Sequence, residues 1–386
     1  MKMNFAAPED FIKIKEMWSY CFGDKDPFLS WYFEEKYDSS NTLAVYEQDN
    51  PVSSIQLLPY QLSFHGKTLD ISYIVGAATL PEARGRGHME ALLKESLLVM
   101  RERGQCINIL LPFDYSFYRR YGWETCYYHR SYNIEMADLK PIIQGYGKLR
   151  SMNADDDIDN MLEVYRSFTA NKNGYIVRNR KDMKCILTDH FFENGKVYIL
   201  EDDAAKMVGY ILYSIQSGVL NIHELVYAGK EAYRGLLSFV HSHAAQAEKI
   251  TWKAPADDVA YILLSQPKRD IISSPFVMTR VIEVEKVLHL LISHCSETTD
   301  IVIEIHDTLA EWNNGIFEIK NNTIIKNGHI KPELICSINT FSQLAMGFIS
   351  PLQAEQLGLL QLKDMQSIEK ANKIFKLANN FINDYY

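Results

Sequence analysis

The sequence lacks the patterns that mark several common classes of protein. Its six cysteines are scattered without Cys-x-x-Cys pairs or zinc-ligand spacing, which argues against a zinc site and favours reduced thiols over a disulfide framework. No run approaches the roughly 18 apolar residues that a membrane span needs, and no secretory leader is recognisable at the start. We therefore expect a cytoplasmic protein without a metal and without a membrane span.

Positive charge is also scarce. The 386 residues include 40 Lys and Arg against 49 Asp and Glu, a formal net charge of −9. An acidic surface disfavours nucleic acid as the main partner and attracts cationic amines, although the same charge is equally typical of a surface that is merely well solvated. The apolar fraction of 47% is sufficient for sizeable cores, and the length predicts two or three domains.

The two best-known phosphate-binding loops are absent as well. There is no Gly-x-x-x-x-Gly-Lys-Ser/Thr sequence and no dinucleotide fingerprint with a third glycine and a later acidic residue. Instead, a glycine-spaced basic turn at 84–89 separates an apolar strand at 71–80 from an amphipathic helix predicted to run to Gly104. A helix start offers unpaired N–H groups and a positive dipole end, so the turn predicts a pyrophosphate cradle in which Gly85 and Gly87 permit close approach.

A second pattern follows this helix. Residues 106–111 predict a strand parallel to the first, and the aromatic segment 113–123 comes next. Taken alone, that segment is a short aromatic helix capped by Gly122. Together, the two patterns resemble the GCN5-related N-acetyltransferases (GNATs). The turn is similar to Gln/Arg-x-x-Gly-x-Gly/Ala, with Met89 at the last small position, and the segment is similar to Phe-Tyr-x-x-x-Gly-Phe/Tyr, with Tyr118 at the tyrosine that faces the cofactor sulfur.

The middle of the chain repeats this order of elements in weaker form. The expected strands and helix are strands at 196–200, 207–216 and 218–226, a helix at 231–248 and a strand at 250–253. The strand–helix turn near Arg234 is shorter than in the first unit and has one glycine fewer. We expect a degenerate repeat that does not cradle a pyrophosphate.

The last hundred residues have a different pattern. Alternating strands are predicted at 301–307 and 315–319, with hairpin turns at 313–315 and 327–328. A helix with one apolar face is predicted over 368–386. This α+β pattern resembles the sterol-carrier-protein-2 type domain.

The order of all these parts is similar to that of the Eis (enhanced intracellular survival) acetyltransferases over the whole chain. The resemblance implies a multi-domain α/β (α+β) protein with tandem GNAT folds, each a mixed sheet flanked by helices, and a sterol-carrier-like α+β domain. We expect a catalytic GNAT domain at 1–148, a degenerate GNAT domain at 149–283 and the sterol-carrier-like domain at 284–386. It also implies a homohexamer in which the last domain reaches the active site of the first.

The resemblance further implies a reaction. Acetyl is transferred from acetyl-CoA, the expected co-substrate, to amines of aminoglycosides, lysine-type small molecules or lysine-bearing peptides. Tyr118 is the implied general acid, and the α-carboxylate of Tyr386 is the implied general base. The implied cofactor-binding residues are Ala77, Ala78, Thr79, Arg84, Gly85, Arg86, Gly87, His88, Met89, Glu90, Phe113 and Asp114.

The acceptor site is less sharply defined. Aromatic residues at 28–33 lie among acidic ones and suit a pocket that stacks on an amine's carbon frame, although aromatic residues on an amphipathic helix also serve as core. Trp31, Asp26 and Tyr385 are the expected acceptor contacts. Two other classes stay open, a non-catalytic acyl-CoA sensor and a lipid carrier that uses a cavity of the C-terminal domain. The sequence does not identify the acceptor amine or the position acetylated.

Overall fold

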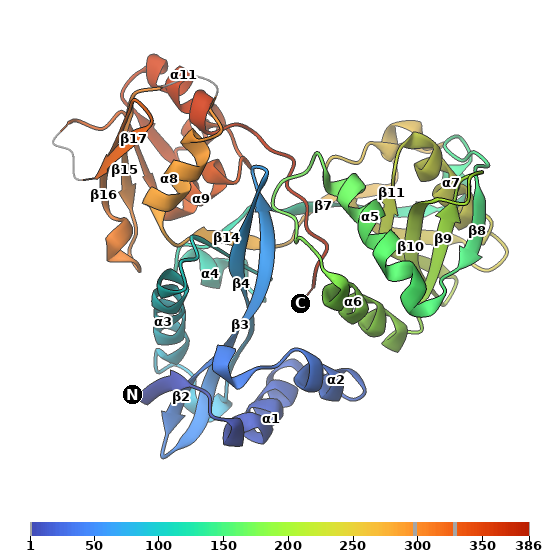
Figure 1. Cartoon of the computed structure of the whole chain (residues 1–386), viewed down its shortest axis with the longest axis horizontal. Helices are drawn as coiled ribbons and strands as arrows, with labels where there is room; N and C mark the ends of the chain where they lie inside the picture. The colour runs from blue at the N-terminus through green and yellow to red at the C-terminus, as the bar shows by residue number, and fades with distance from the viewer. Residues whose placement is uncertain (1, 296–298, 327–329, 386) are drawn as a thin grey trace. The chain divides into compact units, whose positions relative to one another are not determined.

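The computed structural model describes residues 2–295, 299–326 and 330–385. The chain forms two compact units, coloured along the sequence in Figure 1. Unit 1 contains Met1–Tyr127, Phe276–Asn380 and Tyr385–Tyr386, and unit 2 contains Tyr128–Pro275 and Phe381–Asp384. Within the parts of the chain that are described, no helix is long and apolar enough to cross a membrane.

The larger sheet of unit 1 carries the strand–helix–strand order predicted from the sequence. Its strand order is β1-β2-β3-β4-β5-β14-β6. The bounds are β1 (Lys2–Phe5), β2 (Thr42–Glu47), β3 (Asn50–Phe64), β4 (Lys67–Thr79), β5 (Ile107–Leu110), β6 (Glu124–Thr125) and β14 (Met278–Val281). The helices are α1 (Phe11–Phe22), α2 (Phe28–Glu35), α3 (His88–Glu102) and α4 (Tyr115–Arg119).

The amphipathic helix α3 packs against this sheet as its spacing predicts. Leu92, Leu93, Leu97 and Met100 are fully buried and belong to one apolar cluster that also includes strand residues of β3 and β4. Four such side chains, each contributing about 1.5–3 kcal/mol on burial, hold the helix to the sheet far more strongly than helix propensity alone. The predicted parallel pairing is confirmed, because β4 and β5 pair in parallel at Tyr73–Ile109 and Ile74–Leu110.

Two strands pair in a way that their sequence position does not indicate. β14, which follows the second GNAT-like region in sequence, lies between β5 and β6 and pairs antiparallel with both. β7 (Tyr128–Glu135), which follows the first, lies between β13 (Asp270–Pro275) and β12 (Lys249–Pro255) in the sheet of unit 2. Each large sheet is thus completed by a strand from the other region's stretch of sequence.

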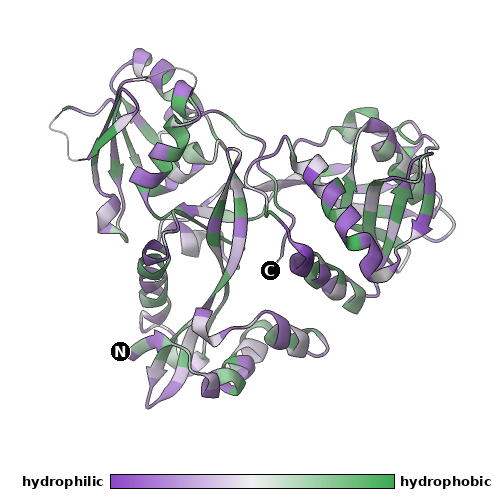
Figure 2. Cartoon of the chain, in the orientation of Figure 1, coloured by the Kyte–Doolittle hydropathy of each residue, from purple (hydrophilic) through white to green (hydrophobic). Residues whose placement is uncertain are grey.

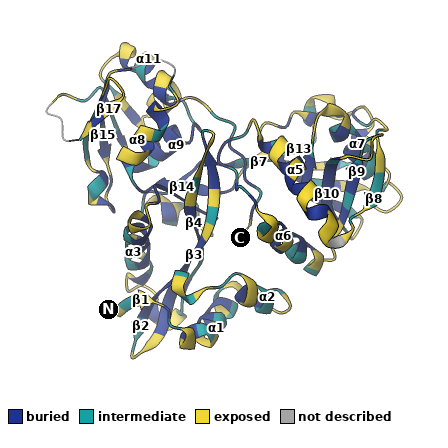
Figure 3. Ribbon diagram, viewed as in Figure 1, coloured by how far each residue is buried: buried dark blue, intermediate teal, exposed yellow. Residues whose placement is uncertain are grey.

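Unit 2 contains the second sheet, in the order β13-β7-β12-β11-β10-β9-β8. Its other strands are β8 (Lys148–Ser151), β9 (Lys196–Glu201), β10 (Met207–Gln216) and β11 (Val219–Tyr227), and its helices are α5 (Ile158–Thr169), α6 (Arg180–Phe192) and α7 (Lys230–His241). The strands predicted in this region are confirmed, including the parallel pairing of β11 with β12. Figure 2 shows β10 largely hydrophobic, and Figure 3 shows it mostly buried.

The helix predicted to reach residue 248 ends earlier. α7 stops at His241, because the Ser242 hydroxyl and the His243 ring both donate hydrogen bonds to the carbonyl oxygen of Phe239, at 2.7 and 2.9 Å. Side chains that bond to helix carbonyls compete with the backbone ladder and favour a helix end. The prediction was wrong by about two turns.

The C-terminal region of unit 1 is an α+β domain with the sheet order β17-β16-β15-β18-β19. Its elements are β15 (Ile301–His306), β16 (Gly315–Lys320), β17 (Thr323–Lys326), β18 (Leu334–Ser337), β19 (Leu360–Leu362), α8 (Val284–Ile292), α9 (Ile338–Ala345), α10 (Pro351–Gln356) and α11 (Met365–Ile374). The two predicted strands are confirmed. The tight hairpin expected at 313–315 is instead a longer connection with a 3-10 turn at Glu311–Asn313, and the turn expected at 327–328 lies outside the described residues.

The tight turn of this domain is at Asn321 and Asn322, with φ of 49° and 59°, a conformation that asparagine tolerates better than most residues. The helix predicted over 368–386 was also wrong in length. α11 ends at Ile374, and the backbone N–H of Ala378 donates to the carbonyl of Gly347 at 2.9 Å. Because that N–H is bonded outside its own segment, it cannot continue a helical ladder, and the chain runs on extended.

Candidate active site

The glycine-spaced turn joins the end of β4 to the start of α3. Gly85 and Gly87 have φ of 75° and 76°, which L side chains rarely adopt, and a Cβ atom added at either would meet nothing within 4 Å. Glycine therefore suits the backbone conformation at both positions, and the space that a side chain would occupy is open. No described side chain caps the N-terminus of α3. An uncapped helix start under open space fits an anionic pyrophosphate.

Both arginines of this turn are held by neighbouring groups. Arg86 Nη1 donates to the two carboxylate oxygens of Glu47 at 2.8 and 2.9 Å, and Arg84 Nε donates to the carbonyl of Thr79 at 3.1 Å. Glu47 also contacts His88 Nε2 at 3.1 Å. The hydrogen bonds from Arg86 and then His88 hold the pKa of the Glu47 carboxyl below its usual value. Glu47, at the end of β2, frames the turn and was not predicted from the sequence.

β4 changes its pairing just where the predicted cofactor contacts begin. Gln56 of β3 pairs with Val75 and Ser54 pairs with Ala78, so the extra residue at Gly76–Ala77 forms a β-bulge. Gly76 has φ of 59°, and a Cβ there would lie 2.4 Å from the ring of Trp18. β5 ends at Leu110, opposite Ile74, whereas β4 continues to Thr79. From the bulge onward, β4 thus extends beyond the end of β5 and is not paired with it.

Tyr118 lies on α4 in the apolar cluster that also includes the partly buried Ala77 and Met89. The residue is 3% exposed, and its hydroxyl has no hydrogen-bond partner among the described residues. Burial raises the pKa of this phenol well above its ordinary value of 10. A phenol that stays protonated and holds no internal partner is suited to donate a proton to a ligand.

Phe113 and Asp114 precede Tyr118 and differ in accessibility. The Phe113 ring is 69% exposed and contacts the Tyr118 ring edge-on at 5.5 Å between centroids. Asp114 Oδ1 accepts hydrogen bonds from the backbone N–H groups of Ser116 and Phe117, at 2.7 and 3.1 Å, and so caps α4. Phe113 is free to contact a ligand, whereas the carboxylate of Asp114 already fixes the helix that carries Tyr118.

The glycine of the aromatic segment has a packing role. Gly122 has φ of 92°, and a Cβ there would overlap the guanidinium of Arg280. Arg280, on β14, is fully buried and donates from Nη2 to both carboxylate oxygens of Asp307 at 2.8 Å. Its Nη1 donates to the carbonyl of Tyr121 at 2.6 Å. This buried pair anchors the end of the aromatic segment to the C-terminal domain of unit 1.

The expected acceptor residues lie at α2. Asp26 is exposed, and its Oδ1 accepts from the Ser30 backbone N–H at 3.0 Å, while Trp31 is partly buried beside Lys36, whose Nζ lies 5.7 Å from the ring centroid. Tyr32 and Phe33 are 0% and 2% exposed and belong to the core. The structure therefore leaves Trp31 and Asp26 reachable from solvent and removes Tyr32 and Phe33 from consideration as pocket walls.

Tyr385 is 39% exposed and packs on Phe276, with 5.0 Å between ring centroids. The carbonyl of Phe276 accepts a hydrogen bond from the Tyr115 hydroxyl at 3.0 Å. Tyr115 is the first residue of α4, the helix that also carries Tyr118. Tyr386, the implied general base, lies outside the described residues.

The equivalent region of unit 2 is built differently. Only Ala228 and Gly229 separate β11 from α7, and Gly235 lies inside the helix, where its Cα faces Tyr146 and Leu200. That glycine is therefore used for close packing. β11 carries a bulge at His223, and next to it a fully buried Arg178 donates to Glu224 at 2.8 Å and to Asp384 at 2.8 Å.

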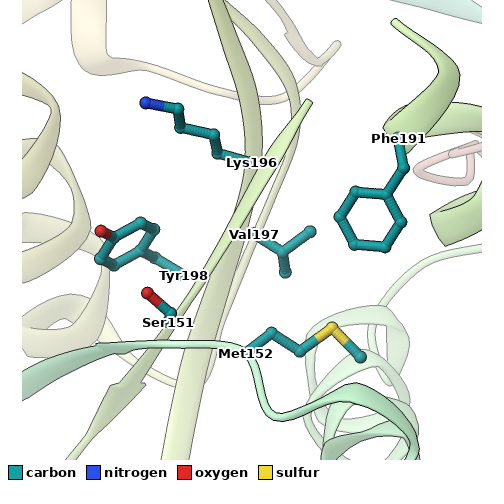
Figure 4. A pocket seen from close by; sticks show the side chains of 6 residues that line it. All are labelled: Ser151, Met152, Phe191, Lys196, Val197 and Tyr198. Carbon is teal, nitrogen blue, oxygen red and sulfur yellow. The ribbon is translucent and has the colours of Figure 1, made fainter. Parts of the chain in front are cut away.

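A cavity of about 370 Å³ also lies in unit 2, lined by Ser151, Met152, Phe191, Lys196, Val197 and Tyr198. Figure 4 shows Val197 directed toward Phe191 on one side of the strand, with Lys196 and Tyr198 on the other. No site residue predicted from the sequence lines this cavity.

Comparison with known families agrees with the GNAT fold and the sterol-carrier-type fold expected from the sequence. Residues 2–126 and residues 174–281 each match a model of an acetyltransferase (GNAT) domain, and residues 284–383 match a model of a sterol carrier protein domain. The chain is a transferase of the GNAT type with two GNAT domains followed by a sterol-carrier-type domain. None of the curated protein sequences matches it.

Several solved structures share this Eis-like architecture over their whole length. A probable N-acyltransferase from Enterococcus faecalis has a TM-score of 0.90 at 23% identity, covering 100% of this chain and 99% of that one. A GCN5-related N-acetyltransferase from Anabaena variabilis has a TM-score of 0.86 at 21% identity, covering 100% of both chains. Eis1 from Mycobacterium abscessus has a TM-score of 0.81 at 17% identity, again covering 100% of both. At these identities the likeness shows a common fold.

Proposed function

We propose that this protein transfers an acetyl group from acetyl-CoA to a cationic amine, of the aminoglycoside or lysine type, at the first GNAT domain. The observation that carries the proposal is the position of Tyr118, a buried residue that packs in the same cluster as Ala77 and Met89. Those two residues mark the end of β4 and the start of α3. The glycine turn between them fits the pyrophosphate of the co-substrate.

The chemistry assigns a role to the phenol. The amine nitrogen attacks the thioester carbonyl carbon, the C–N bond forms, and the C–S bond breaks. The proton lost by the amine goes to a base, and the sulfur leaving group takes a proton from the Tyr118 hydroxyl. A base is needed because a lysine-type ammonium with a pKa near 10.4 is only about 0.04% neutral at pH 7.

For the general base we propose the α-carboxylate of Tyr386, the group that the sequence resemblance implies. Its support is that the preceding residue, Tyr385, packs on Phe276, which is hydrogen-bonded to α4. Turnover that survives an extra residue added after Tyr386 would contradict this assignment. A homohexamer, a cytoplasmic location and domain boundaries after residues 148 and 283 are further proposals that rest on the sequence resemblance.

The proposal is tested by the release of free CoA thiol. Purified protein with acetyl-CoA and a panel of aminoglycosides, polyamines and lysine peptides should release thiol with at least one acceptor, with mass spectrometry showing the acetylated amine. Tight binding of acetyl-CoA without thiol release would support an acyl-CoA sensor instead. Uptake of an apolar ligand without any CoA binding would support a lipid carrier.

Replacement of Gly87 by alanine tests the cradle. Alanine in this left-handed conformation costs about 1–2 kcal/mol and places a methyl group above the first amides of α3. We expect the Kd for CoA to rise by about tenfold, a loss of about 1.4 kcal/mol, in isothermal titration calorimetry.

The matched control is Gly104→Ala at the other end of α3. Gly104 has φ of 79° and equally open space, so this variant has the same backbone strain without touching the cradle. Equal CoA affinity in the two variants would show that the turn does not bind the pyrophosphate.

A further inference from the structure

Only one of the two polar groups of the Gln56 side-chain amide has a hydrogen-bond partner in the described part of the chain. Gln56, on β3, is 1% exposed, and its Oε1 accepts a hydrogen bond from the Tyr32 hydroxyl at 2.8 Å. Its Nε2 is buried and has no hydrogen-bond partner in the described part of the chain. A buried NH2 group without a partner destabilises a fold, so its retention calls for a partner that binds later.

The unsatisfied amide lies beside the β4 bulge. A Cβ at Gly76 would be 3.2 Å from Gln56 Nε2, and Gly76 and Ala77 are themselves partly exposed. The neighbouring strand residues Ile55 and Leu57 belong to the cluster under α3, so the Gln56 side chain lies on the opposite face of the sheet, toward α1 and α2. That face also carries α2, which holds the expected acceptor residue Trp31.

Large rings hold the amide in place. The Trp18 ring lies over Gly76 and contacts the Tyr32 ring, with 4.5 Å between centroids. Tyr32 is fully buried and fixes the orientation of Gln56 through the bond to Oε1. Nε2 therefore stays directed toward the bulge, and a fixed direction makes a donor effective when charge develops on a bound group.

We propose that Gln56 Nε2 donates a hydrogen bond to the thioester carbonyl oxygen of the acetyl donor and stabilises the negative charge that develops on it. A donor at this place needs an acceptor atom, and the carbonyl oxygen of the thioester is the one on which negative charge develops during the reaction. Gln56 places a side-chain donor beside Ala77, which the sequence resemblance implies as a cofactor contact. This inference rests on the proposed function and makes Gln56 a catalytic residue of that site.

The test compares two variants that differ at Gln56 alone. Tyr32→Phe keeps Nε2, and the double variant Tyr32→Phe with Gln56→Met removes all three polar groups of this pair, so that no buried polar atom of the pair is left without a partner. We expect kcat of the double variant to be about 10²-fold below that of Tyr32→Phe, the loss typical of one such donor. The Kd for acetyl-CoA should agree within about twofold, and the melting temperature of the double variant should not be lower than that of Tyr32→Phe.

Gln61→Met is the matched control, since Gln61 is an exposed glutamine on the same strand that bonds Asp70 at 3.1 Å. It should keep the kcat of the wild type. Equal kcat for Tyr32→Phe and the double variant would overturn the inference and leave the proposed function standing. A lower kcat of the double variant that is accompanied by a lower melting temperature would assign Gln56 a structural role only. Absence of thiol release by the wild type would overturn both.

Discussion

Replacement of Tyr118 by phenylalanine should lower kcat for amine acetylation by about 10²–10⁴-fold, the range that a general acid contributes. The change deletes one oxygen that holds no hydrogen bond within the described residues, so packing in the cluster around Trp123 is kept. We expect the Kd for acetyl-CoA and the melting temperature to stay close to those of the wild type. Pre-steady-state thiol release measured with a chromogenic disulfide reports the chemical step directly.

The pH dependence adds a second readout. Burial raises the pKa of the Tyr118 phenol well above its ordinary value of 10, so the wild type should not lose activity by tyrosine ionisation between pH 9 and 10. Tyr121→Phe is the matched control on the same aromatic segment, because its hydroxyl makes only a long contact with Glu90 at 3.4 Å. If Tyr118→Phe turned over as fast as Tyr121→Phe, the proton would come from another group.

Replacement of Arg178 by methionine should destabilise unit 2 by about 3–5 kcal/mol, the cost of leaving buried charges without their partner. The guanidinium is fully buried, donates to Glu224 and Asp384, and lies 4.1 Å from the centroid of the Tyr165 ring. Urea unfolding, monitored by hydrogen exchange of the backbone amides in β10 and β11, measures the loss in the free energy of unfolding. Arg180→Met, two residues away, breaks an exposed ion pair with Asp159 and an exposed hydrogen bond to the carbonyl of Asp155, and it should cost less than about 1 kcal/mol.

The same variant has a distinctive pH signature. Burial acts to raise the pKa of Glu224, but the charge and hydrogen bonds of Arg178 outweigh it, and the pKa is lowered. The wild-type contribution is therefore present above the unfolded value near 4.3 and is lost as the pH falls toward the folded pKa. Without Arg178, burial is opposed only by the hydrogen bonds from Asn383 and Tyr210, and the pKa of Glu224 rises. The variant should therefore gain stability as the pH falls from 7 to 5. A destabilisation that does not change over that range would contradict this account.

Local sequence signals predicted the parts of the site that depend on neighbouring residues. The glycine turn, α3 and the aromatic helix of Tyr118 each follow from conformational or periodic requirements within a few positions. Glu47 and Gln56 were missed because the groups beside them, Arg86 in the glycine turn and the Gly76 bulge on β4, are distant in sequence, and no local pattern specifies such contacts. The apolar spacing from Ala371 to Tyr385 predicted a helix, but long-range backbone bonds such as Ala378 to Gly347 determine an extended chain instead.

The crossed strands β7 and β14 limit how this protein can be divided for study. A fragment that ends at Tyr127 would lack β14 and leave the edge of β5, a strand whose four residues are all buried, open to solvent, where it could pair with another molecule. A fragment that begins at Lys148 would likewise lose β7 from the interior of its sheet. Recombination that moves either GNAT half as a separate module is disfavoured for the same reason, because each half would lose a strand from the interior of its sheet.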